Sequence, residues 1–164
     1  MKVIGIGSNL ASPQGSQPAD VVRAAIARLE TVGLRPVAVS RLFETAPVPV
    51  SGQPWYVNAV AAVETALSPH DALIACMDLE TQFGRLRSVP NAARILDLDI
   101  LAWDERVIRD PDLTVPHPRL AERAFVLHPL ADIAPDWRHP ESGRSVAEML
   151  AELPTGQQIR PLGA

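Results

Sequence analysis

The sequence contains few cysteines, lysines and aromatic residues, and each shortage excludes a class of site. Cys76 is the only cysteine, so the 164-residue chain can form neither an internal disulfide nor a cysteine-based zinc site. Lys2 is the only lysine, and the rest of the 15 basic residues are arginines. A Walker P-loop and the ATP site of a protein kinase both need a lysine in mid-sequence, so both are excluded. Any phosphate binding must rely on arginine, metal ions or backbone groups.

Long apolar runs and an excess of positive charge are also absent. The apolar stretch at residues 3–6 is too short for a signal peptide, and no run approaches the length of a membrane helix. We therefore expect a cytoplasmic protein with no membrane partner. The formal net charge of −4 argues against a nucleic-acid partner. The length and a hydrophobic content of 47% are typical of one globular domain, covering residues 1–164.

Apolar periodicity and turn residues predict the main elements. We expect strands at 2–7, 35–44, 55–64 and 95–103, helices at 19–32 and 69–83, and further helical stretches at 119–133 and 145–153. The three prolines of 45–54 predict an irregular segment. The order strand, helix, strand, strand, helix, strand is typical of a ferredoxin-like split βαβ core. The predicted fold is α+β, an antiparallel sheet flanked by helices, with extra C-terminal helices.

Asp97 and Asp99 are the strongest chemical signal in the sequence. Side chains alternate along a strand, so both carboxylates project from one face, about 7 Å apart. Aspartate is disfavoured in strands, and acids this close repel each other unless they are paired or bind a metal. Mg²⁺ prefers carboxylate oxygens and retains waters that a substrate phosphate can replace. The alternative is a solvated strand end; we favour metal binding.

Basic and polar residues near this strand extend the prediction. Arg85, Arg87 and Arg94 lie just upstream and offer forked donors suited to phosphate oxygens. Glu80 falls on the apolar stripe of a helix and needs a partner such as Arg85 or Arg94, unless the helix end is solvated.

Tyr56 and Asn58 share one face of a strand, where a ring could stack and an amide could bind its edge. An ordinary half-buried strand has the same pattern. His117 lies between two prolines, and a lone histidine in such a place is more often structural than functional.

Several blocks together resemble the 6-hydroxymethyl-7,8-dihydropterin pyrophosphokinases of folate biosynthesis. The matching blocks follow the family's order and span most of the chain. They are Gly7-Ser8-Asn9-Leu10, Tyr56-Val57-Asn58-Ala59, Leu79 to Arg87, Arg94 to Leu101, Leu113 to His117, and Arg123 to Leu127.

The resemblance implies transfer of the β,γ-diphosphate of ATP to the pterin hydroxymethyl group, with release of AMP. It implies two Mg²⁺ ions held by Asp97 and Asp99, and catalytic roles for Arg85 and Arg94. The implied pterin site is Thr45, Val48, Tyr56, Asn58 and Phe125. The implied ATP site is Glu80, Arg85, Arg87, Arg94, Ile100, Thr114, His117 and Arg123.

The sequence departs from the family in one loop and leaves two alternative functions open. Many members have Trp-Gly-Pro where this sequence has Asn91-Ala92-Ala93. This difference affects the loop expected over ATP and leaves the metal site unchanged. A metal-dependent phosphohydrolase would also use the aspartate pair. A ferredoxin-like nucleotide- or RNA-binding module would expose aromatic residues on a basic surface, which this composition disfavours. We expect a monomer with ATP and the pterin as its partners.

Overall fold

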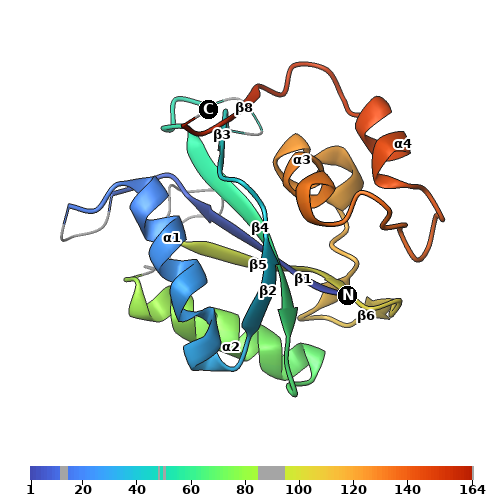
Figure 1. Ribbon diagram of the computed structural model, residues 1–164, viewed down its shortest axis with the longest axis horizontal. Coiled ribbons are helices and arrows are strands. Elements are labelled where there is room, and N and C mark those ends of the chain that lie inside the picture. The colour runs from blue at the N-terminus through green and yellow to red at the C-terminus, as the bar shows by residue number, and fades with distance from the viewer. Residues whose placement is uncertain (12–14, 48, 50, 85–94, 164) are drawn as a thin grey trace.

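An antiparallel sheet runs through the middle of the molecule, with helices on both of its faces (Figure 1). The computed structural model describes residues 1–11, 15–47, 49, 51–84 and 95–163. In chain order the elements are β1 Lys2–Ser8, α1 Pro18–Arg28, the 3₁₀ helix η1 Leu29–Val32, β2 Arg35–Val39, β3 Phe43–Thr45, β4 Tyr56–Glu64, α2 Pro69–Gln82, β5 Asp97–Trp103, β6 Ile108–Arg109, β7 Thr114–Val115, the 3₁₀ helix η2 Leu120–Glu122, α3 Ala124–Ile133, α4 Val146–Ala151 and β8 Ile159–Pro161.

The sheet has the strand order β5-β1-β4-β3-β8, and β2 pairs with β4 further along that strand. Every pairing in it is antiparallel. The short strands β6 and β7 form a separate two-stranded sheet. Residues 57–63 of β4 are buried without interruption, because helices cover both faces at this point.

Helices α1 and α2 cover one face of the sheet, and α3 covers the other with α4 packed against α3 (Figure 1). Alternate residues of each central strand supply the two apolar layers. The first layer includes Ile4, Leu29, Leu79, Leu98 and Ile100. The second includes Val3, Leu101, Leu127, Leu130 and Met149. The predicted antiparallel sheet with flanking helices and additional C-terminal helices is confirmed.

The strand predicted over 35–44 is wrong in one respect, because it is divided into β2 and β3. At Ser40 the backbone N–H donates to the Val60 carbonyl at 2.9 Å, and the Ser40 hydroxyl accepts from the Val60 N–H at 2.9 Å. A side chain thus takes the place of a ladder carbonyl. The Arg41 N–H donates instead to the Asp132 carboxylate on α3 at 3.0 Å. These local bonds end the regular pairing.

The C-terminal third departs from the sequence prediction in two further places. The helix expected over 119–133 is broken at Arg123, which has an extended backbone (φ −114°, ψ 113°) between η2 and α3. Residues 159–161 form β8 and pair with β3, although the sequence analysis expected no strand there. In contrast, α2 begins at Pro69 as predicted, since the Ser68 hydroxyl accepts from the Asp71 N–H at 3.1 Å.

Candidate active site

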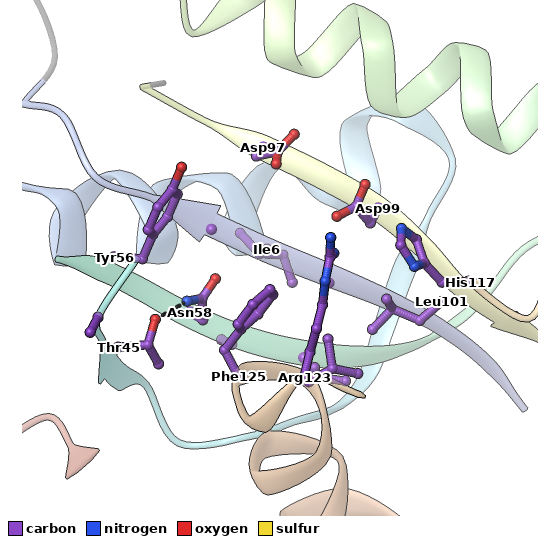
Figure 2. Close-up of a pocket in the computed structure, with 16 residues that line it drawn as sticks. Ile6, Thr45, Tyr56, Asn58, Asp97, Asp99, Leu101, His117, Arg123 and Phe125 are labelled. Carbon is purple, nitrogen blue, oxygen red and sulfur yellow. Dashed lines mark hydrogen bonds between the residues drawn. The ribbon is translucent and has the colours of Figure 1, made fainter. Parts of the chain in front are cut away.

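A cavity of about 240 Å³ opens on the α3 face of the sheet, beside the first turn of α3 (Figure 2). Strands β1, β4 and β5 form its floor. Its walls come from the end of β3, from the loop that carries His117, and from Arg123, Phe125 and Val126. Segments far apart in the sequence therefore meet at one site, as the sequence analysis expected for its candidate residues.

Asp97 and Asp99 are half-buried and line this cavity, while Leu98 and Ile100 point into the core on the opposite face of β5. The neighbouring strand β1 places a glycine opposite each carboxylate. Gly7 is paired with Asp97, and Gly5 is paired with Asp99. No side chain from β1 therefore stands beside the acids, and the floor between them is bare backbone.

The Asn58 amide lies deeper in the cavity and has a fixed orientation. Its Nδ2 donates to the Thr45 hydroxyl at 2.7 Å, and Asn58 itself is buried. Its Oδ1 faces Gly7, where a Cβ atom would lie only 2.6 Å from that oxygen. In the view of Figure 2 the amide lies between the rings of Tyr56 and Phe125, and all three side chains line the cavity. A flat polar ring would fit such a slot.

In the view of Figure 2 the Arg123 and His117 side chains extend toward Asp99. His117 is held by its backbone N–H, which donates to the Leu101 carbonyl at 2.9 Å. Its Nδ1 accepts from the Arg119 N–H at 3.1 Å, so the proton of the neutral ring sits on Nε2. Burial, and then the positive charges of Arg123 and Arg119, lower the pKa of His117 to about 4. The ring is thus a neutral hydrogen-bond donor near pH 7.

The Arg123 guanidinium is partly buried and lies 5.2 Å from the centre of the Phe125 ring. Burial lowers the pKa of Arg123, while the charge of Asp99 raises it. Arginine stays protonated even so. The cavity therefore combines two carboxylates, a permanent cation, a neutral imidazole donor and an aromatic slot.

Comparison with known proteins identifies the family. Residues 3–135 match the family model described as 7,8-dihydro-6-hydroxymethylpterin-pyrophosphokinase. The chain belongs to this family. The resemblance seen in the sequence is thereby confirmed.

Relatives of similar length support the assignment. A 2-amino-4-hydroxy-6-hydroxymethyldihydropteridine pyrophosphokinase of Pseudomonas aeruginosa is 43% identical over 152 residues, which is 92% of this chain and 90% of the relative. A protein of the same name from Methylorubrum extorquens is 39% identical over 154 residues, covering 93% and 94%.

Longer proteins contain the same region as one part. The folic acid synthesis protein fol1 of Schizosaccharomyces pombe is 38% identical over 85% of this chain, but only 19% of that protein is covered. The structure of Plasmodium falciparum HPPK-DHPS wild type with pteroate superposes with a TM-score of 0.71 at 14% identity, covering 92% of this chain and 42% of that chain. At this identity the likeness concerns the fold.

The structure brings most of the predicted pterin residues of this pyrophosphokinase family member together with part of the predicted ATP site. Thr45, Tyr56, Asn58, Phe125, Asp97, Asp99, His117 and Arg123 all line the cavity. Ile100 and Thr114 do not: the Ile100 side chain lies in the core, and Thr114 is exposed on β7. Val48, Arg85, Arg87 and Arg94 lie outside the described residues.

Glu80 is buried but does not line the cavity. Its carboxylate accepts from the Leu98 N–H at 2.9 Å and so ties α2 to the strand that carries Asp97 and Asp99. This contact gives the carboxylate on the apolar stripe a backbone partner. Cys76, one turn earlier on α2, is buried too, and burial together with the charges of Glu80 and Asp99 raises its pKa to about 12.

Gly5 and Gly7 also line the cavity, although neither is among the site residues predicted from the sequence. Two glycines at alternate positions of a strand remove the side chains from one face, and this spacing was the available signal.

Proposed function

We propose that this cavity is where the pterin and the phosphates of ATP meet. Family membership makes the chain an ATP-dependent pyrophosphokinase, which transfers a pyrophosphoryl group from ATP to hydroxymethyldihydropterin in folate synthesis. The observation that carries the site assignment is the shared cavity: a polar aromatic slot and a carboxylate pair face the same space.

The slot formed by Tyr56, Phe125 and Asn58 is proposed to hold the pterin. The two rings would stack on its faces, and the amide would bind its edge. Because one Nδ2 hydrogen is directed to Thr45, the remaining amide hydrogen and Oδ1 are left for the substrate. Thr45 and its neighbours at the end of β3 would complete the edge contacts through backbone groups.

Asp97 and Asp99 are proposed to hold two Mg²⁺ ions. The fit rests on hard oxygen donors that line one cavity and on the glycines opposite them, which leave room for ions and phosphate oxygens. When bound, Mg²⁺ supplies charge neutralisation of the phosphates. The side chains of the cavity would supply the other contacts to the phosphates. Arg123 offers a permanent positive charge to a phosphate oxygen, and the Nε2–H of His117 donates a hydrogen bond to the phosphates.

The strand order supports the ferredoxin-like description within the broader α+β fold. Between β1 and β2 runs α1, and β4 inserts between these two strands; between β4 and β5 runs α2, and β1 inserts between those two. This order supports the split βαβ arrangement that we propose for the core. We further propose a single domain, a monomer, a cytoplasmic setting and no nucleic-acid partner. No helix among the described residues has the length and apolar character to cross a membrane.

A product assay tests the proposal. The purified protein is incubated with ATP, Mg²⁺ and 6-hydroxymethyl-7,8-dihydropterin, and nucleotides are separated by chromatography. We expect AMP to accumulate with one pterin diphosphate formed per AMP, and neither product to form without the pterin. Accumulation of ADP or free phosphate instead would favour a phosphohydrolase and contradict the proposal.

A further inference from the structure

Two side chains of the cavity depend on a break in a helix. Arg123 has an extended backbone, so η2 ends before it and α3 begins after it. This break carries Arg123 and Phe125 into the cavity. It also leaves the Glu122 carbonyl and the Ala124 N–H at helix ends, where neither has a partner within its own helix.

One side chain from the C-terminal segment bonds both of these groups. The Oε1 of Gln157 accepts from the Ala124 N–H at 2.9 Å, and its Nε2 donates to the Glu122 carbonyl at 2.7 Å. A single primary amide thus bridges the break, with its acceptor on one side and its donor on the other. Arg123 itself provides no side-chain cap for α3.

The segment that carries Gln157 is also fixed to the opposite wall of the cavity. The carbonyl of Gln158 accepts from the Ala46 N–H at 3.1 Å, and β8 then pairs with β3 so that Ile159 lies opposite Thr45. Thr45 and Ala46 line the cavity on that side. Adjacent residues of one segment therefore bond both walls of the slot.

We propose that Gln157 is a positioning residue, which holds the first turn of α3 at a set distance from the end of β3 and so sets the placement of Phe125 and Arg123. This inference rests on the proposed function of the cavity as the pterin site. Gln157 does not line the cavity, so its effect on substrate acts through the helix start alone.

Three variants test the proposal. Gln157→Met keeps the length of the side chain but removes both hydrogen bonds. Gln157→Glu keeps an acceptor for the Ala124 N–H, with a charge that suits a helix N-terminus, and loses the donor to Glu122. Gln158→Ala is the matched control, because the exposed Gln158 takes part through its backbone carbonyl, which alanine retains.

Pterin affinity is measured by calorimetry at 25 °C with a saturating non-hydrolysable ATP analogue and Mg²⁺, and kcat by AMP release. We expect Gln157→Met to weaken pterin binding about tenfold and to lower kcat. The loss of kcat should be smaller than the roughly 100-fold loss of rate that a 1 Å misplacement can cause. Gln157→Glu should fall between Gln157→Met and wild type, and Gln158→Ala should match wild type. If Gln157→Met does not fold, the proposal is tested by comparing the pterin affinity and kcat of Gln157→Glu with those of Gln158→Ala.

A lower melting temperature with pterin affinity and kcat equal to the control would assign Gln157 a merely structural role and overturn the proposal. Amide hydrogen exchange separates this failure from a failure of the proposed function. If wild type neither binds pterin nor releases AMP, the function is wrong. The positioning role of Gln157 is then tested on the Val126 and Leu127 amides, which donate to the Arg123 carbonyl. Their protection from hydrogen exchange should fall in Gln157→Met but not in Gln158→Ala. Unchanged protection there would also overturn the proposal.

Discussion

Replacing Gly7 with alanine should weaken pterin binding, because the new methyl group would clash with the Asn58 amide of the pterin slot. The new Cβ would lie 2.6 Å from the Asn58 Oδ1, a separation that real Cβ atoms essentially never show. Gly7 lies on β1, between β4 and β5, so its backbone cannot withdraw easily. The clash can then be relieved only if the amide moves, which its bond to the Thr45 hydroxyl at 2.7 Å resists, or if the strands separate.

The clash between the new Cβ and the Asn58 Oδ1 can be relieved in two ways, and both lower the stability of the fold by a similar amount. If Asn58 turns away, a buried hydrogen bond is lost, at about 1–3 kcal/mol. If the amide stays, the strands must separate to accommodate an extra methyl group, again at about 1–3 kcal/mol. We expect the free energy of unfolding to fall by this amount. Pterin affinity should fall about tenfold or more, which corresponds to about 1.4 kcal/mol of lost edge contact.

Gly5→Ala provides the matched control two residues away on the same strand face. There the nearest atom to a new Cβ is the Leu101 Cδ1 at 3.2 Å, a side-chain methyl group that can yield. Urea denaturation and calorimetric titration of the pterin on both variants provide the assay. Pterin binding by Gly7→Ala as tight as that by Gly5→Ala would refute the argument that bare backbone at Gly7 positions the amide.

Three further predictions concern the other walls of the cavity. Asp97→Ala or Asp99→Ala should abolish AMP formation, because each variant lacks one proposed Mg²⁺ ligand. The circular dichroism spectrum and the unfolding midpoint should stay near wild type, because both side chains are only half-buried. Wild-type activity at limiting Mg²⁺ would refute the metal assignment. Asn58→Ala and Phe125→Ala should each weaken pterin binding about tenfold with ATP-analogue binding nearly unchanged, and a parallel loss of both affinities would contradict the slot. For His117, the folded pKa of about 4 lies below the ordinary 6.5, so between these pH values the unfolded chain binds the extra proton. Its contribution to stability should be fully present above pH 6.5 and be lost as the pH falls toward 4; a denaturation series without Mg²⁺ should show a shallower acid loss in His117→Gln, and equal slopes would contradict the assignment.

Short-range sequence patterns were enough to predict much of the fold and several of the side chains that line the cavity. Strand alternation placed Asp97 and Asp99 on one face, and the same rule paired Tyr56 with Asn58. These predictions depend only on backbone geometry, which sequence spacing determines. The Ser68-Pro69 start of α2 depends on a local cap in the same way.

What could not be predicted depends on partners distant in sequence. The break between β2 and β3 arises because Ser40 bonds Val60 and Arg41 bonds Asp132. Strand β8 exists because β3 offers it an edge, and apolar alternation over three residues gives no signal of that. The cavity placement of Arg123 likewise requires the helix break that Gln157 bridges.

The buried thiol of Cys76 makes the protein convenient for spectroscopy. The thiolate is the reactive form of cysteine, and with a pKa raised to about 12 almost none is present near neutral pH. Maleimide reagents should therefore leave the native chain unmodified. A cysteine introduced at Thr155, which is exposed in the segment leading to Gln157, would then accept a single fluorophore without any background substitution. Its emission could report on the C-terminal segment while substrates bind.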